Sequence, residues 1–414
     1  MNTKKITNIY KDIKENTFLH ECLKAWNNSE TALDFDFWGA VWIISVLVQR
    51  NFLLVRPTAP LFPNFYILFI AESGIARKSF AVTRSKYLLQ NIVDNYDDLN
   101  VITAQTTPQK FNILLTKSSI EKGKSLVNIN CSEFITLFKN KSIIEFFTDI
   151  FDCPNERKGH GSISHGEINI RNLYATCLAA STPNYYFKAI TKEEVEGGFT
   201  SRCIIVPAEK GKRKIAWGYE YDQSKLIKLG KKLVDFIQQQ PATREVSTKA
   251  IQRYSQWYLR KRSSGDLFTR NFEAREQDHV LKLACLLSLN DFCNKIEEQH
   301  INLAIKIIQN IKKKAQKFIN KELTIETNDT MTKIIERIRD IIHSKAENGI
   351  IHRELYLRVH NSCTSDEFNY IINTMHELGM IEKLQPYKRK AVIYRETKNL
   401  YKIDIKNITK MFNM

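Results

Sequence analysis

Hydrophobic runs of two kinds alternate along the first half of the chain. The run FYILFIA at 65–71 contains seven mostly β-favouring apolar residues, which is typical of a strand buried on both faces of a parallel sheet. A polar turn and a helical stretch from Ser79 to about Asn95 follow it. The same patterns predict strands at 101–104, 126–130, 173–180 and 203–207, and helices at 108–116 and 143–151. Because strand and helix alternate, residues 57–207 are expected to form a three-layer α/β domain.

After Pro207 the pattern changes to long amphipathic helices, predicted at 223–239, 248–262, 274–290 and 298–320. The polar stretch TIETNDT at 324–330 then indicates a boundary. Beyond it we predict helices at 331–346, 351–359 and 366–378, and a strand pair around 386–391. Three helices followed by a β-hairpin are the order of a winged helix. With a helical stretch at 17–50, the predicted segments are an N-terminal helical segment (1–56), the α/β core (57–207), a basic helical lid domain (208–325) and a winged helix (326–414).

The net charge of the chain indicates the kind of partner that it binds. The 414 residues are 43% hydrophobic and 26% charged, which fits a globular protein with a core. The formal net charge is +17, and residues 207–325 carry 24 basic and 13 acidic residues, net +11. A protein this basic is expected to meet a polyanion, either nucleic acid or an acidic membrane surface. Part of the charge is equally well interpreted as solvated helix face.

Location follows from the apolar runs and the cysteines. The longest apolar run, 37–48, is shorter than the roughly 20 residues that span a bilayer, so we expect no membrane segment. The eight cysteines form no CxxC pair, and most lie in apolar runs. They are expected to be buried free thiols in a reducing cytoplasm.

A candidate phosphate-binding loop lies where strand, turn and helix meet at 71–79, AESGIARKS. Small residues such as Gly74 and Ala76 let backbone N–H groups approach phosphates, and a helix N-terminus favours their charge. Lys78 would reach the β- and γ-phosphates, and Ser79 would hold Mg²⁺. The match to GxxxxGK[ST] is imperfect, because Arg77 and Glu72 stand at the two glycine positions. An ordinary strand–helix turn is the alternative.

Two later strand ends carry polar residues that an ATPase would use. The strand LVNIN ends in Cys-Ser-Glu-Phe, so Glu133 would polarise the attacking water. Ser132 stands where the usual preceding Asp is expected, and a solvated Glu after an edge strand is the other interpretation. The strand at 173–180 ends in Ser-Thr-Pro, where Thr182 would contact the γ-phosphate or simply cap a helix. In the GGFTSR turn, Arg202 is a candidate arginine finger toward a neighbouring subunit.

Together these motifs resemble P-loop ATPases from phage, plasmid and other mobile-element replication regions, a replicative helicase-like group. Their order is also similar to the AAA+ core of minichromosome-maintenance (MCM) helicases, which have an Asp-Glu-Phe strand end, a Ser-Arg-Phe finger and a closing winged helix. The resemblance covers roughly residues 35–410. It implies a three-layer P-loop (AAA+/RecA-like) fold that uses ATP and Mg²⁺, and a hexamer-like ring that acts on DNA as a helicase or translocase. A separate primase or replication initiator is an implied partner.

The resemblance also implies roles for single residues. Residues 158–172 would form a DNA-contacting hairpin, with Lys158 and His165 as contact candidates. The segment NFEAR precedes the helix DHVLKLACLLSL, so Arg275, with Arg270 as the alternative, is the candidate second sensor of the γ-phosphate.

The last predicted helix of the winged helix is acidic and fits a sequence-reading helix poorly. The hairpin tip with Lys388, Arg389 and Lys390 would still contact DNA phosphates.

Departures from the pattern leave two other functions open. Arg77 and Ser132 replace expected residues, so the chain is alternatively a weakly hydrolysing or non-hydrolysing nucleotide switch, such as a DNA-binding initiator. A DNA-binding regulator that has lost nucleotide binding is the third hypothesis.

Overall fold

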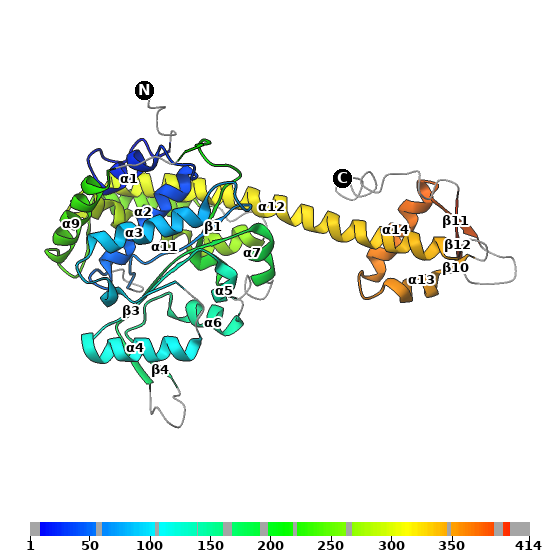
Figure 1. Ribbon diagram of the computed structural model, residues 1–414, viewed down its shortest axis with the longest axis horizontal. Helices are drawn as coiled ribbons and strands as arrows, with labels where there is room; N and C mark the ends of the chain where they lie inside the picture. The colour runs from blue at the N-terminus through cyan, green and yellow to red at the C-terminus, as the bar shows by residue number, and fades with distance from the viewer. Residues whose placement is uncertain are drawn as a thin grey trace. The chain divides into compact units, whose positions relative to one another are not determined.

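The computed structural model describes residues 9–54, 60–103, 107–138, 140–159, 168–190, 198–217, 222–261, 267–345, 349–384 and 392–397. The chain divides into two compact units, Met1–Lys317 and Phe318–Met414 (Figure 1). Within the described residues, no helix is both long enough and apolar enough to cross a membrane.

A five-stranded parallel sheet forms the centre of the first unit. Its strands, in spatial order, are β2 (Val101–Ile102), β3 (Ser125–Cys131), β6 (Leu173–Ser181), β1 (Tyr66–Ile70) and β7 (Cys203–Pro207). Every residue of β1, β3, β6 and β7 is buried. Strands covered on both faces need apolar side chains on both faces, which explains the continuous apolar runs of the sequence. The predicted α/β architecture with a parallel sheet is confirmed.

Helices cover both faces of this sheet (Figure 1). Helices α2 (Leu33–Val48) and α3 (Lys78–Ile92) pack on one face, where Phe35 stacks on Phe69 of β1 with ring centroids 4.4 Å apart. Helices α4 (Pro108–Lys122) and α6 (Lys141–Ile150) lie on the other face, where Phe147 meets Tyr66 of β1 at 5.7 Å. Successive side chains of a strand point to opposite faces, so β1 anchors both helical layers.

Shorter elements complete the first unit. They are α1 (Phe18–Trp26), η1 (Tyr96–Leu99), α5 (Phe134–Phe138), α7 (Pro183–Ala189), η2 (Thr200–Arg202), and the strand pairs β4 (Glu156–Gly159) with β5 (Ile168–Arg171) and β8 (Glu245–Val246) with β9 (Lys295–Ile296). Helices α9 (Ser224–Gln238), α10 (Thr248–Arg260) and α11 (Leu267–Asn290) follow β7, and α12 (Glu298–His343) begins in this unit.

The second unit has a core of its own. After the last turns of α12 come β10 (Ile350–Ile351), α13 (His352–Val359), α14 (Ser365–Glu377), β11 (Ile381–Leu384) and β12 (Ile393–Glu396). The strands form an antiparallel sheet in the order β10-β12-β11. Ile338, Leu355 and Phe368 are among the fully buried residues that join the three helices.

Two helix boundaries differ from the sequence-based expectations. Helix α12 runs without a break through 324–330, where we expected a boundary, although the two units separate close by, at 317/318. Threonine, asparagine and aspartate lower helix propensity only slightly, and the stretch contains no Gly or Pro that would break the backbone hydrogen bonds. Helix α11 begins at Leu267, before the predicted start at 274, so the whole NFEAR segment with Arg275 belongs to this helix.

Candidate nucleotide-binding site

The loop of residues 71–77 joins the buried strand β1 to helix α3 and leaves room beside its backbone. Gly74 has a φ of 77°, a left-handed conformation that glycine adopts without steric cost. A Cβ built on Gly74 would meet no atom within 4 Å, so the space over this residue is open. Ala76 is fully buried as a whole residue, so the open space lies over Gly74 and not over Ala76.

Arg77 stands at the junction between loop and helix. Its φ of 49° is also left-handed, which costs a non-glycine residue about 1–2 kcal/mol. The motif has a glycine at this position, and Arg77 adopts the left-handed conformation that a glycine would favour. The Arg77 Nε donates a hydrogen bond of 2.6 Å to Oε2 of Glu30, and its side chain does not cap α3. The first N–H groups of α3 therefore receive no hydrogen bond from the N-cap side chain, and such groups bind anions readily.

Lys78 is the first residue of α3 and lies near two carboxylates. Its Nζ donates to the carbonyl oxygen of Glu72 at 3.5 Å. Burial lowers the pKa of Lys78, while the negative charges of Glu72 and Glu133 act in the opposite direction. The fold thus brings Lys78 within electrostatic reach of Glu133. Ser79, the second residue of the helix, is exposed.

Three strand ends meet at this edge of the sheet. Glu133 follows β3 and is exposed, and Thr182 follows β6 as the N-cap of α7. The Ala71 N–H donates to the Ser181 carbonyl at 3.3 Å, which ties the loop to the end of β6. The carboxyl ends of parallel strands share one edge, and ligands of α/β proteins bind there. Lys78, Glu133 and Thr182 are brought to this common edge.

A strap, defined as residues 208–217, follows β7 and passes beside the loop. The Ile215 N–H donates to Oε1 of Glu30 at 2.9 Å. A Cβ on Gly211 would come within 2.0 Å of the Glu30 carbonyl oxygen, so the strap backbone lies against the segment before α2. A cavity of about 760 Å³ separates strap and loop. Its lining consists of Glu30, Gly74, Ile75, Arg77, Lys210, Gly211, Arg213, Lys214, Ile215 and Ala216, with four cations against one carboxylate.

A buried ion group fastens the strap. Asp36 of α2 is inaccessible to solvent and accepts hydrogen bonds from Arg84 of α3 and Lys212 of the strap. Thr31 donates a further bond of 2.5 Å to Oδ1 of Asp36. A buried carboxylate needs such partners, because removing it from water is costly. Helix α2, helix α3 and the strap are therefore joined by the carboxylate of Asp36.

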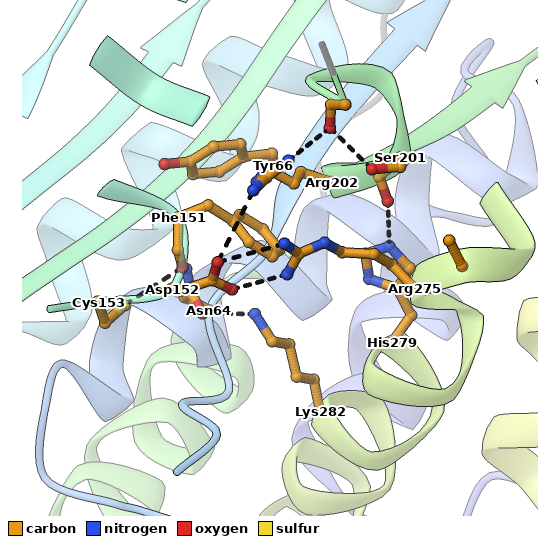
Figure 2. A network of polar contacts seen from close by, with 12 residues as sticks. Asn64, Tyr66, Phe151, Asp152, Cys153, Ser201, Arg202, Arg275, His279 and Lys282 are labelled. Atoms are coloured by element: carbon orange, nitrogen blue, oxygen red, sulfur yellow. Dashed lines mark hydrogen bonds and ion pairs between the residues drawn. The ribbon is translucent and has the colours of Figure 1, made fainter. Parts of the chain in front are cut away.

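The two candidate arginines lie at the other edge of the sheet. Arg202 ends η2 immediately before β7, which places it at the amino ends of the strands. Arg275 of α11 donates to both oxygens of Asp152, at 2.7 and 3.3 Å, and Arg202 forms an ion pair with Asp152 at 3.8 Å (Figure 2). Arg202 and Arg275 are brought together, but away from the Lys78 edge.

The candidate DNA contacts are only partly covered. Strands β4 and β5 pair antiparallel, as a hairpin over 158–172 requires. The side chain of Lys158, the whole of His165 and residues 388–390 lie outside the described residues. In α14, the side chain of Glu367 completes a capping box with Thr364, so one acidic residue of this helix has a local structural role.

Sequence reasoning missed Glu30, Asp36, Asp152, Lys212 and Lys282. Two of them carried a signal: Asp36 and Lys282 are charged residues within otherwise apolar helical runs, and such residues are buried only when paired. Glu30 and Lys212 sit among polar residues in the sequence, and Asp152 lies next to a Pro-containing turn, so none of the three stands out from an ordinary surface residue.

No protein-family model matches the sequence, and no curated protein matches it. Among solved structures, the chain is similar to a full-length MCM homolog from Methanopyrus kandleri, with a TM-score of 0.44 and 12% sequence identity. The similarity covers 75% of this chain and 62% of that one.

Proposed function

We propose that the chain is an AAA+-like ATPase that binds ATP with Mg²⁺ at residues 71–79 and acts on DNA in the replication of a mobile element. One observation carries the proposal: a buried parallel strand, an open loop and an uncapped helix meet at Lys78, and the carboxylate of Glu133 lies within its electrostatic reach. A lysine at the start of such a helix suits the β- and γ-phosphates.

Mg²⁺ needs few protein ligands at a site of this kind, because it is held largely by water and by substrate phosphates. Within the described ranges, no three His, Cys, Asp or Glu side chains gather into a metal-binding group. The exposed hydroxyl of Ser79 next to Lys78 fits a metal that is held mainly by the nucleotide. Bound there, Mg²⁺ would neutralise charge on the transferred phosphoryl group.

The cavity between loop and strap suits the nucleoside part of the ligand. It is continuous with the phosphate loop, since Gly74 and Arg77 line it, and its volume of about 760 Å³ is in the range of small-molecule pockets. Glu30 supplies a carboxylate acceptor, and Arg213 is held by a hydrogen bond that it donates to Oδ1 of Asn28 at 2.9 Å.

For hydrolysis, Glu133 would orient the attacking water and Thr182 would contact the γ-phosphate. Arg202 would act on the nucleotide of a neighbouring subunit. Five residues of β1 span about 17 Å, so an arginine at the amino edge cannot reach the loop of its own chain. Arg275, beside Arg202, is subject to the same geometry. This supports hydrolysis at subunit interfaces of a ring.

DNA is the proposed polyanionic partner. The net charge of +11 in residues 207–325 supports contacts with phosphates that do not depend on sequence and that weaken with salt. The hairpin at 158–172 would supply further contacts. The order helix, strand, helix, helix, strand, strand in the second unit supports a winged helix, with Lys388, Arg389 and Lys390 at the tip of its hairpin.

A second function is favoured by two specific residues. Ser132 occupies the place of the expected Asp, and Arg77 occupies that of a glycine in a left-handed conformation. Both changes would weaken catalysis more than binding. The alternative is therefore a nucleotide switch that binds ATP and orders a DNA-bound assembly without efficient turnover.

Steady-state ATPase activity and ATP affinity, each with and without single-stranded DNA, test these functions. Lys78→Ala should weaken ATP binding by about 10- to 100-fold, because a hydrogen bond to a charged group contributes roughly 1.5–3 kcal/mol. Lys86→Ala, two turns along the same helix, is the matched control and should behave like the parent. DNA-stimulated turnover that Lys78→Ala removes would support the motor. ATP binding without turnover would support the switch. Unchanged ATP binding in Lys78→Ala would contradict the phosphate-loop assignment.

A further inference from the structure

Asp152 lies between the two arginines at the amino edge of the sheet (Figure 2). Two nitrogens of Arg275 donate hydrogen bonds to the Asp152 carboxylate, at 2.7 and 3.3 Å, and the nearest Arg202 nitrogen is 3.8 Å from Oδ2. Within the described residues, Asp152 is the hydrogen-bonding partner of the Arg275 guanidinium. In the described part of the chain, Arg202 donates one hydrogen bond, to the Gly198 carbonyl at 2.9 Å, although a guanidinium has five N–H donors.

Among the residues that the structure describes, positive charge exceeds negative charge around this carboxylate. A third cation, Lys282, is buried nearby and donates to Oδ1 of Asn64 at 2.7 Å. All three cations surround the ring of Phe151: the Lys282 nitrogen is 3.8 Å from its centroid, and the guanidinium carbons of Arg275 and Arg202 are 5.6 and 6.0 Å away. Asp278 is a second carboxylate whose charge acts on Lys282. The set as a whole therefore favours binding of an additional anion.

The cations are held more firmly than the carboxylate. Asp152 follows α6 in a turn, and its side chain is 55% exposed, compared with 16% for Arg202 and 23% for Arg275. Arg202 is fixed by the Gly198 carbonyl and Arg275 by helix α11, and both lie against the buried ring of Phe151. A small rotation of Asp152 into solvent would leave both guanidinium groups in place and facing outward.

We propose that the Asp152 carboxylate is the resident anion of a phosphate-binding arginine pair, and that a phosphate group replaces it between Arg202 and Arg275. Carboxylate and phosphate oxygens accept the same bidentate hydrogen bonds from guanidinium groups, so one can substitute for the other. Asp152 is a positioning residue: it keeps the arginines side by side while no phosphate is bound. Only the identity of the anion, a nucleotide phosphate of a neighbouring subunit, rests on the proposed function.

Thermal unfolding in the presence of tripolyphosphate tests the replacement. The experiments use the full chain with Lys78→Ala, so that the phosphate loop contributes little to anion binding. Adding Asp152→Asn removes the competing charge. Compared with the Lys78→Ala parent, this protein should show a larger increase in Tm when tripolyphosphate is added, and the half-saturating tripolyphosphate concentration should be at least tenfold lower. Stabilisation by a ligand follows its affinity for the folded state. A purely structural role of Asp152 would not change this dependence on the anion.

Three controls locate the effect. Asp149, about one helical turn before Asp152, is another exposed carboxylate and pairs with Arg157 at 2.7 Å. The Asp149→Asn protein should respond to tripolyphosphate like the Lys78→Ala parent. Asp152→Glu restores the charge and should also respond like the parent. Adding Arg275→Gln to Asp152→Asn should abolish the gain. If Asp152→Asn unfolds without ligand, tripolyphosphate should restore a cooperative transition.

Other results would overturn the proposal. An equal response of the Asp152→Asn protein and its parent would do so, as would a gain that survives Arg275→Gln or an unfolded Asp152→Asn protein that tripolyphosphate does not rescue. The proposed function is judged separately, by whether Lys78→Ala weakens ATP binding in a chain that retains Asp152.

Discussion

Lys282 should make the stability of the first unit depend on pH in the alkaline range. The residue is 1% exposed, and burial lowers the pKa of its side chain to about 8. A solvent-exposed lysine has a pKa of about 10.4, so the unfolded chain binds this proton more tightly than the folded chain. Stability therefore rises with pH between about 8 and 10.4, where the unfolded state carries more protons. A difference of about 2.4 pKa units corresponds to roughly 3 kcal/mol.

The substitution Lys282→Met keeps the length of the side chain and removes its charge. It leaves Oδ1 of Asn64 without its donor, which costs about 1–3 kcal/mol at every pH. The stability difference between variant and parent should therefore shift by about 3 kcal/mol between pH 7 and 10.5, with the variant relatively most stable at pH 7.

Urea unfolding followed by tryptophan fluorescence measures this difference in the relevant unit. All five tryptophans belong to the first unit: Trp26, Trp38, Trp42, Trp217 and Trp257. Lys282→Arg, which keeps its charge throughout, is the control and should lose stability relative to the parent as pH rises. Parallel pH profiles for the parent and Lys282→Met would refute the assignment of a lowered pKa to this buried lysine.

Two further predictions concern the strap beside the phosphate loop. Gly211→Ala would place a Cβ about 2.0 Å from the Glu30 carbonyl oxygen, so the strap must move. ATP affinity, measured by calorimetric titration, should therefore fall. An unchanged affinity would contradict the proposal that the nucleotide binds in the cavity beside the strap. Asp36→Asn removes the charge that pairs with Arg84 and Lys212, and should lower the free energy of unfolding by about 3–5 kcal/mol in a urea titration, since it leaves buried cations uncompensated. A loss below 1 kcal/mol would contradict the importance of this ion group.

The sequence predicted well those features that depend on neighbours along the chain. The apolar run at 65–71 indicated a doubly covered strand, and β1 is buried at every residue. Three polar residues that follow strands of the sheet, Lys78, Glu133 and Thr182, were expected to act together. Their common edge follows from the parallel direction of the strands, which alternating strands and helices already implied.

Local composition was not decisive where backbone hydrogen bonds or steric freedom determined the structure. The polar stretch at 324–330 indicated a boundary, but α12 continues through it because nothing in it prevents helical hydrogen bonding. Arg77 adopts the left-handed conformation that the motif assigns to glycine, and its ion pair with Glu30 accompanies that strain. Neither outcome can be deduced from a residue's chemical type alone.

Pairs that are distant in sequence were decided only by the tertiary structure. Asp152 meets Arg275 across 123 positions, and Lys282 meets Asn64 across 218. The sequence determined by itself which segments would be buried strands, which would be helices and which would be basic, because burial and helix formation depend on local patterns of side chains. Which charged groups became partners depended on the strand order β2-β3-β6-β1-β7 and on the packing of α11 against η2, which directly precedes β7. An ion pair requires two groups within a few ångströms, and that separation is a property of the folded chain rather than of either residue.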